Sequence, residues 1–197
     1  MASIPAVSPL APAAFPEVPP VPGARWASAA LGLRYRGRPD VMLLEVPEGS
    51  AVAGVFATSS IPGHPVRWCR SILEHGTARA VIVNAGQANV FRGEEGEAAV
   101  AAEVEAVATA LGCERHEVYV ASTGVIGARL PAERIAAAVP DLVAALEPGG
   151  IAAAARAIMT TDTFPKAAST TAEIDGVTVT IAGIAKGSGM IAPDMAT

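Results

Sequence analysis

The sequence predicts a mixed α/β fold. Short runs rich in β-branched residues alternate along the chain with longer segments in which apolar residues recur at helical spacing. Apolar residues occupy 51% of the 197 positions, which is enough to bury a sizeable core. No internal repeat is evident, so this alternation favours strands and helices that pack into layers.

The first 22 residues differ from the rest. They contain seven of the 16 prolines, and such a segment forms neither a helix nor a strand ladder. We therefore expect an extended arm over residues 1–22 and one α/β domain over 23–197. Within that domain, residues 40–46 and 51–58 are predicted strands, and Pro-Glu-Gly-Ser at 47–50 suits the turn of a hairpin between them.

The middle of the chain gives the clearest predictions. Residues 78–84 (ARAVIVN) are a nearly continuous apolar run, typical of a strand buried on both faces. Residues 94–111 predict an amphipathic helix that ends at Gly112. A short strand over 117–121 (EVYVA) then runs into a Ser-Thr-Gly loop.

The last third of the chain continues the alternation. Two helical pieces are predicted at 131–139 and 141–146, separated by Pro140, and an alanine-rich helix at 151–159. Residues 173–184 predict a hairpin that turns at Asp-Gly, a pair suited to a two-residue turn.

Composition excludes several classes of protein. The net charge of −5 argues against a general binder of nucleic acid or of anionic membranes. No apolar tract reaches the roughly 20 residues of a spanning helix, and no basic start precedes an apolar stretch. Cys69 and Cys113 form no CxxC pair, and without HExxH or clustered histidines we expect no metal site. We expect a soluble, cytoplasmic protein with reduced cysteines.

Three hydroxyl-rich segments follow regular elements, where binding residues concentrate. They are Ser-Thr-Gly at 122–124, Thr-Thr-Asp-Thr at 160–163 and Met-Ala-Thr at 195–197. Backbone N–H groups in the first would suit an oxyanion hole, although threonines in the first two can simply cap turns or helices. Lys186 can pair with a substrate carboxylate or be a solvated strand end, and the glycines after it do not match a phosphate loop.

A threonine can also be a nucleophile. If cleavage of a peptide bond leaves a threonine at a new N-terminus, its α-amine can act as base for its own hydroxyl. That mechanism needs no histidine, and His64, His75 and His116 are predicted surface residues. The glycine-rich segment after the last predicted strand would normally lead into another element. We therefore expect the chain to be a fragment of a longer precursor or one subunit of a cut one.

The chain contains four further motifs, in the order VNAGQAN at 83–89, ASTGVIG at 121–127, AIMTTDTFPK at 157–166 and KGSGMIAPDMAT at 186–197. Together these motifs resemble those of the ornithine acetyltransferase family of arginine biosynthesis. The first departs mildly from the family's usual asparagine loop. The resemblance covers nearly the whole chain after the arm, as the N-terminal half of the family's precursor. It implies the N-terminal, α-chain portion of a stacked-sheet αββα sandwich.

The resemblance also implies site residues. The precursor would cut itself between Ala196 and Thr197, and Thr197 would be the nucleophile that takes an acetyl group from N2-acetylornithine and passes it to glutamate. Thr123 and Gly124 would form the oxyanion hole. The implied substrate-binding residues are Thr160, Thr161, Lys186 and Thr197.

The resemblance further implies that the cut α and β chains stay together as an α2β2 heterotetramer without a cofactor or metal. Some members of the family also acetylate glutamate from acetyl-CoA, and no residue here separates the two kinds of enzyme. Two other interpretations stay open: an N-terminal-nucleophile amidohydrolase or aminopeptidase, and a non-catalytic subunit that only shapes the pocket. A cut before Thr197 would also place that residue at the start of the β chain, whereas it closes this sequence.

Overall fold

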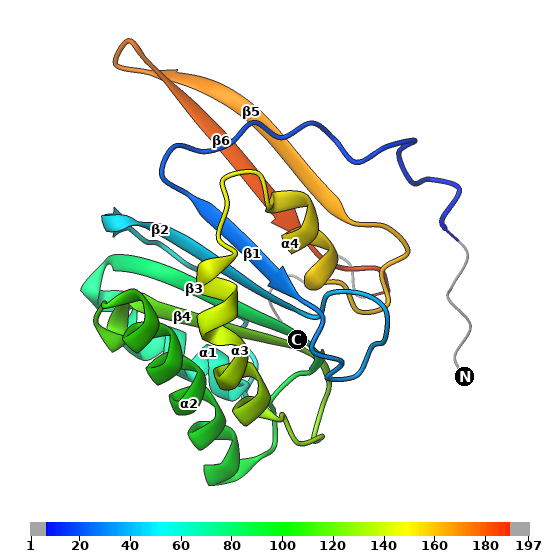
Figure 1. Ribbon diagram of the computed structural model, residues 1–197, viewed down its shortest axis with the longest axis vertical. Coiled ribbons are helices and arrows are strands. Elements are labelled where there is room, and N and C mark those ends of the chain that lie inside the picture. Colours follow the sequence, from blue (N-terminus) through cyan, green and yellow to red (C-terminus); the bar gives the residue numbers. More distant parts are fainter. Residues whose placement is uncertain (1–6, 190–197) are drawn as a thin grey trace.

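Four strands form the main sheet in the order β1-β2-β3-β4 (Figure 1). The computed structural model describes residues 7–189. The strands are β1 (Arg25–Ala29), β2 (Val41–Ala51), β3 (Thr77–Gln87) and β4 (Val118–Val125). β1, β2 and β3 are antiparallel neighbours, whereas β3 and β4 are parallel because a helix crosses over between them. The predicted mixed α/β class is confirmed.

Two helices cover one face of this sheet (Figure 1). The helices of the fold are α1 (His64–Ile72), α2 (Gly93–Leu111), α3 (Ala132–Ala144) and α4 (Ile151–Ala157), with short 3-10 turns η1 (Leu73–His75) and η2 (Arg115–Glu117). Val104 of α2 and Ile135 of α3 are fully buried against Leu43 and Ile82 of the central strands. Burying such side chains contributes about 1.5–3 kcal/mol each, so this layer is the main core.

The opposite face of the sheet carries α4 and a second sheet. Met42 packs on Ala154 of α4, whereas its neighbour Leu43 faces α2 and α3, because successive strand residues point to opposite faces. The second sheet in the described part of the chain is a hairpin of β5 (Lys166–Ile174) and β6 (Val177–Ala185). It turns at Asp175-Gly176, both with positive φ, which confirms the predicted Asp-Gly turn.

Helix α1 covers the outer edge of β4. The Trp68 indole N–H donates to the Val118 carbonyl at 2.9 Å, and the Cys69 thiol contacts the Val120 carbonyl at 3.2 Å. The Val120 N–H in turn donates to the Cys69 sulfur at 3.4 Å. Burial raises the pKa of the Cys69 thiol, so this cysteine is a protonated structural residue.

The hairpin predicted between 40–46 and 51–58 is wrong. One strand, β2, continues through the Pro-Glu-Gly-Ser segment, which forms a wide bulge opposite Arg79. The Arg79 guanidinium donates to the Val46 carbonyl and to the Glu45 carboxylate, so the bulge is held by side-chain contacts. Proline and glycine mark this bulge because proline lacks the N–H that a regular ladder requires.

The helix break predicted at Pro140 is also wrong. Helix α3 continues through it, although proline removes one backbone hydrogen bond. Val139 and Leu142, on either side, are buried in the main core and hold both halves on one axis. The prediction of α2 is confirmed, and Gly112 ends that helix in the left-handed conformation at φ 66°.

The proline-rich arm forms no helix or strand between residues 7 and 22. It runs beside the β5–β6 hairpin (Figure 1), where the Ser8 N–H donates to the Thr163 hydroxyl and the Ser169 hydroxyl donates to the Glu17 carbonyl. The boundary between arm and domain at residue 22 stays a prediction. No helix within residues 7–189 combines the length and apolarity needed to cross a membrane.

Candidate active site

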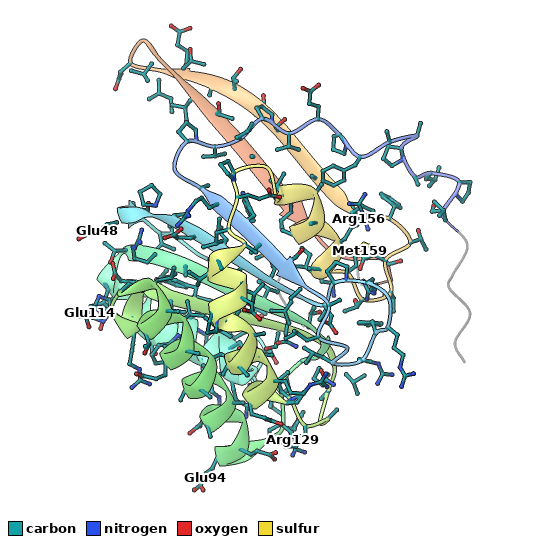
Figure 2. All side chains as sticks on the ribbon, in the orientation of Figure 1. Glu48, Glu94, Glu114, Arg129, Arg156 and Met159 are labelled. Atoms are coloured by element: carbon teal, nitrogen blue, oxygen red, sulfur yellow. The ribbon has the colours of Figure 1, made fainter. Side chains whose placement is uncertain are left out.

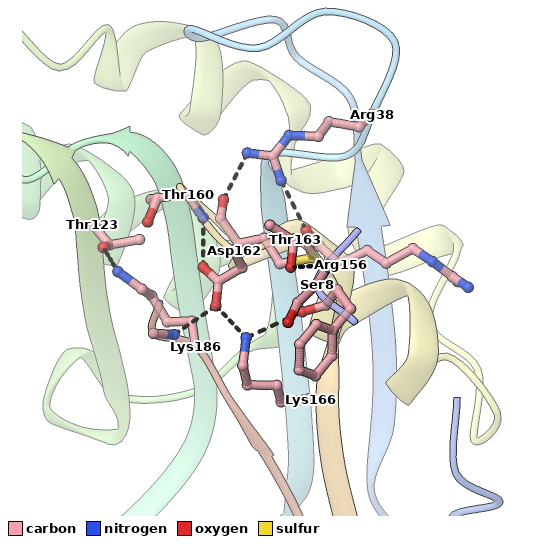
Figure 3. Close-up of polar contacts among 12 residues, drawn as sticks. Ser8, Arg38, Thr123, Arg156, Thr160, Asp162, Thr163, Lys166 and Lys186 are labelled. Carbon is pink, nitrogen blue, oxygen red and sulfur yellow. Dashed lines mark hydrogen bonds and ion pairs between the residues drawn. The ribbon is translucent and has the colours of Figure 1, made fainter. Parts of the chain in front are cut away.

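Three segments that are far apart in the sequence meet where β4 and β6 end (Figure 3). Lys186, just after β6, donates from its Nζ to the Thr123 hydroxyl of β4 at 2.8 Å. Asp162, in the loop after α4, accepts the N–H of Gly187 at 2.7 Å and that of Thr160 at 3.1 Å. The structure therefore brings the predicted residues Thr123, Thr160 and Lys186 into one site.

The Thr123-Gly124 pair is positioned by the parallel pairing of β3 and β4. Gly124 lies opposite Gly86, and both have strongly positive φ values, 137° and 135°. A Cβ added at Gly124 would lie 2.3 Å from the Gly86 carbonyl carbon and oxygen. Only glycine allows this approach of two backbones. The Ser-Thr-Gly segment at 122–124, which the sequence predicted as a loop, belongs to the last part of β4.

Asp162 is the buried charge of the site. Its side chain is 0% exposed, and its Oδ1 accepts from Lys166 Nζ at 2.7 Å as well as from Gly187. Burial alone would raise the pKa of Asp162, but the hydrogen bonds from Lys166, Gly187 and Thr160 hold it below its usual value. Asp162 is therefore an ionised carboxylate with donors from three directions.

The end of α4 is fixed by Arg38 from the loop between β1 and β2. Its guanidinium donates to the carbonyls of Arg156 and Met159, at 3.3 and 2.8 Å. Both residues lie at the end of this helix (Figure 2), where the regular helical bonding of carbonyls stops, and the Arg156 carbonyl also accepts the Met159 N–H at 3.3 Å. A cation there also complements the helix dipole. Arg38 thereby holds the chain just before Thr160.

The remaining predicted residues are placed as follows. Lys186 and Thr161 are exposed, so both side chains are accessible to a small molecule. The predicted cleavage pair, Ala196 and Thr197, lies outside the described residues. Within residues 7–189, no group of three or more His, Cys, Asp or Glu side chains could hold a metal ion.

An apolar pocket of about 450 Å³ adjoins the end of β4. The segment between β2 and α1 covers it, and Cys69, Tyr119 and Ser122 contribute to its wall. The Tyr119 and Ser122 hydroxyls have no hydrogen-bond partner among the described residues. Ser122 directly precedes Thr123, so the pocket begins next to the site.

One histidine prediction is wrong. His64 is buried, with 7% of its surface exposed, because it begins α1 against Gly96 of α2. A Cβ at Gly96 would lie 2.2 Å from the imidazole, so this glycine makes room for the ring. Burial lowers the pKa of His64 and favours the neutral form.

Sequence reasoning did not single out Asp162 or Arg38. An aspartate in a hydroxyl-rich loop commonly binds a nearby backbone N–H, and the Thr160 contact follows that local pattern. The bond to Gly187 spans 25 residues, and the bonds from Arg38 span more than 100. No local signal in the sequence indicates contacts of that range.

The chain resembles proteins of one family along nearly its whole length. A family model described as ArgJ family matches residues 25–197. An arginine biosynthesis bifunctional protein ArgJ from Bradyrhizobium diazoefficiens is 50% identical over 97% of this chain, and one from Ruegeria pomeroyi is 54% identical over 100%. The chain covers 46% and 49% of those two proteins, so it spans about half the length of the curated relatives it matches.

Two crystal structures match the fold. An arginine biosynthesis bifunctional protein ArgJ from Bacillus halodurans has a TM-score of 0.83 and 31% identity, covering 88% of this chain and 91% of that one. An ornithine acetyltransferase complexed with ornithine, from Mycobacterium tuberculosis, has a TM-score of 0.81 and 39% identity over 88% and 92%. These matches confirm the fold expected from the four motifs. The chain belongs to the ArgJ family.

Proposed function

We propose that this chain is the α half of a self-cleaving ornithine acetyltransferase, which moves the acetyl group of N2-acetylornithine to glutamate. The contact of Lys186 with the Thr123 hydroxyl, beside the loop that Asp162 holds, is the observation that carries the proposal. The names of the relatives, which specify arginine biosynthesis and ornithine acetyl transfer, support it.

The geometry suits acyl transfer. The Thr123 oxygen accepts a hydrogen bond from Lys186, so its own O–H hydrogen is directed elsewhere and can donate to an oxyanion. The N–H of Gly124, on the turned backbone at the end of β4, is the second donor. Donors fixed in this way stabilise the charge of a tetrahedral intermediate. The exposed ammonium of Lys186 pairs with the α-carboxylate that both substrates carry.

Thr197 supplies the nucleophile in this proposal. Its hydroxyl attacks the Ala196 carbonyl, the peptide nitrogen leaves as the new α-amine, and water hydrolyses the resulting ester. The freed amine then acts as base for the same hydroxyl, which takes the acetyl group as ornithine departs. Glutamate attacks the acetyl-threonine, and the two half-reactions give ping-pong kinetics.

The rest of the enzyme follows from the same proposal. The β chain from the same precursor completes the site, two copies of each chain form an α2β2 heterotetramer, and the assembly is cytoplasmic. One amide is exchanged for another of similar energy, so the transfer uses no cofactor or metal. Acetyl-CoA is a second acetyl donor in this proposal, and the relatives are named bifunctional proteins of arginine biosynthesis.

Intact mass spectrometry of the full-length protein tests this function. We expect two masses that sum to the precursor, and one added acetyl group on the chain that starts at Thr197 after incubation with N2-acetylornithine. Glutamate should remove that acetyl group as N-acetylglutamate. The Thr197→Ala variant should stay uncut and unmodified. A single unmodified mass from the unaltered protein would refute the proposal, and release of free acetate with glutamate present would indicate an amidohydrolase.

A further inference from the structure

We propose that Asp162 is a positioning residue that sets the geometry between Thr160 and Lys186. This inference rests on the proposed function, because it assigns a role within the same site. Among its hydrogen bonds to the described residues, none goes from Asp162 to the hydroxyl of Thr123. It acts through the backbone at two points of the site and through one neighbouring lysine (Figure 3).

The burial of Asp162 makes its contacts strong. A carboxylate that is 0% exposed loses its hydration, which costs several kcal/mol unless donors replace the water. Here Oδ2 accepts from the Thr160 N–H, and Oδ1 accepts from the Gly187 N–H and from Lys166. Because the ionised form depends on all three donors, displacement of any one is opposed.

The bond to Gly187 fixes the direction in which the chain leaves β6. Gly187 has a φ of 151°, within the range that favours glycine, so the backbone there has a conformation that other residues rarely adopt. Lys186 is the residue just before this anchored N–H, and its long side chain reaches across to Thr123. Thr160 is held by the other oxygen of the same carboxylate. One side chain therefore holds the backbone of Thr160 and the peptide N–H that directly follows Lys186.

Lys166 gives this arrangement a second property. It neutralises Asp162, since its Nζ lies 2.7 Å from Oδ1, and it also donates to the Phe164 carbonyl at 3.2 Å. Asp162 therefore holds Lys186 through the backbone, while Lys166 takes up the charge of the carboxylate. The ammonium of Lys186 stays available for a substrate carboxylate.

Steady-state kinetics of full-length variants test the consequence. In Asp162→Asn, the amide replaces an acceptor by a donor, and we expect the KM for N2-acetylornithine to rise at least tenfold, with kcat referred to the active fraction. The active fraction is counted by mass as the acetylated β chain. Asp141→Asn, on the exposed surface of α3, is the matched control and should keep the KM unchanged. An unchanged KM in Asp162→Asn would reduce Asp162 to a purely structural role.

Amide hydrogen exchange tests the positioning itself. Exchange in Asp162→Asn should accelerate at the N–H groups of Thr160 and Gly187 and stay unchanged in α2. If Asp162→Asn does not fold, Lys166→Gln carries the test. The Asp162 carboxylate then lacks its ion pair, so it should attract the Lys186 ammonium and raise the KM. Unaltered exchange at both sites in Asp162→Asn would overturn the inference, whatever reaction the protein catalyses. Absence of an acetyl adduct in the unaltered protein would instead overturn the proposed function.

Discussion

The contact between Lys186 and Thr123 joins two predicted site residues that are 63 positions apart. Lys186 is exposed, whereas Thr123 is partly buried at the end of β4. An exposed ammonium held by one neutral hydroxyl keeps its charge for another partner. The two side chains therefore have separable roles, which single substitutions can distinguish.

Substitution of these two residues should give different kinetic signatures. We expect Lys186→Met to raise the KM for both substrates about 10- to 100-fold, since it removes one charge-assisted hydrogen bond. Thr123→Val should instead lower kcat about 100- to 1,000-fold, as for the loss of one oxyanion donor. Steady-state kinetics of the full-length enzyme measure both. Thr178→Val, on the exposed hairpin, is the control, and equal effects on KM and kcat in both variants would contradict the assignment.

Glu103 is another buried carboxylate, and it lacks the donors that Asp162 has. It is 1% exposed on α2, and its Oε1 has no partner among the described residues. Burial raises the pKa of Glu103 to about 8. The folded state thus binds a proton that the unfolded chain loses near pH 4, so this group contributes stability below pH 4 that is lost as the pH rises toward 8.

Glu103→Gln should remove that pH dependence. We expect the variant to match the unaltered protein at pH 5 and to exceed its free energy of unfolding at pH 8, by on the order of 3 kcal/mol. Urea unfolding at the two pH values measures the difference. Glu105→Gln, whose side chain is 62% exposed, should show no such change. If the free energy of unfolding changed with pH equally in all three proteins, Glu103 would be ionised in the folded state.

At the scale of elements, local chemistry predicted some structures and not others. Helix α2 was predictable because its apolar spacing and its terminal glycine indicate the same helix. The bulge in β2 was not, since Pro-Glu-Gly-Ser suits a turn equally well and the long-range contacts of Arg79 decide the outcome. Pro140 was misleading for a similar reason, because packing on both sides outweighs one lost hydrogen bond.

In the candidate active site, too, local sequence predicted some features, whereas long-range contacts decided others. The motifs identified Thr123, Thr160 and Lys186, and the fold brings these three together. Their common support was not predictable, because Asp162 contacts Gly187 only after β5 and β6 have folded back. Local patterns identify residue types at the ends of elements, whereas the pairing of those ends depends on the fold.

The glycine pair between β3 and β4 gives a prediction for this element. Gly124→Ala would place a Cβ against the Gly86 backbone, and we expect a loss of about 1–3 kcal/mol in stability together with loss of acetyl transfer. Thermal unfolding and the acetyl adduct measure the two effects. Gly183→Ala on β6 has open space around its new methyl group and should change neither. Normal activity in Gly124→Ala would mean that the strands separate without harm.

At the scale of the whole molecule, the two sheets differ in how much of their apolar surface is covered by other elements. The main sheet has helices on both faces, whereas the β5–β6 hairpin leaves Ile174, Val177 and Ile181 more than half exposed. Apolar surface gathered on one element in this way promotes association. The chain spans about half the length of its curated relatives, and under the proposed function the β half covers this surface.

The chain over residues 1–197 should therefore associate when it is produced alone. We expect light scattering to detect large species, and co-production with the rest of the protein to restore one defined size. The Val177→Thr and Ile181→Thr double variant should reduce the scattering, since it removes two exposed apolar side chains. A monodisperse chain of about 20 kDa would contradict this expectation.

The capping of β4 by Trp68 and Cys69 determines where such association starts. An uncapped border strand is a template on which a second chain can add by backbone pairing, and that is the usual route to amyloid-like growth. Here the indole N–H and the thiol already occupy backbone groups along that border. A second chain can therefore pair with β4 only after α1 has moved away from this edge of the main sheet. Misassembly should therefore begin away from this border, and the thiol of Cys69 should stay unreactive toward alkylating reagents until β4 is exposed.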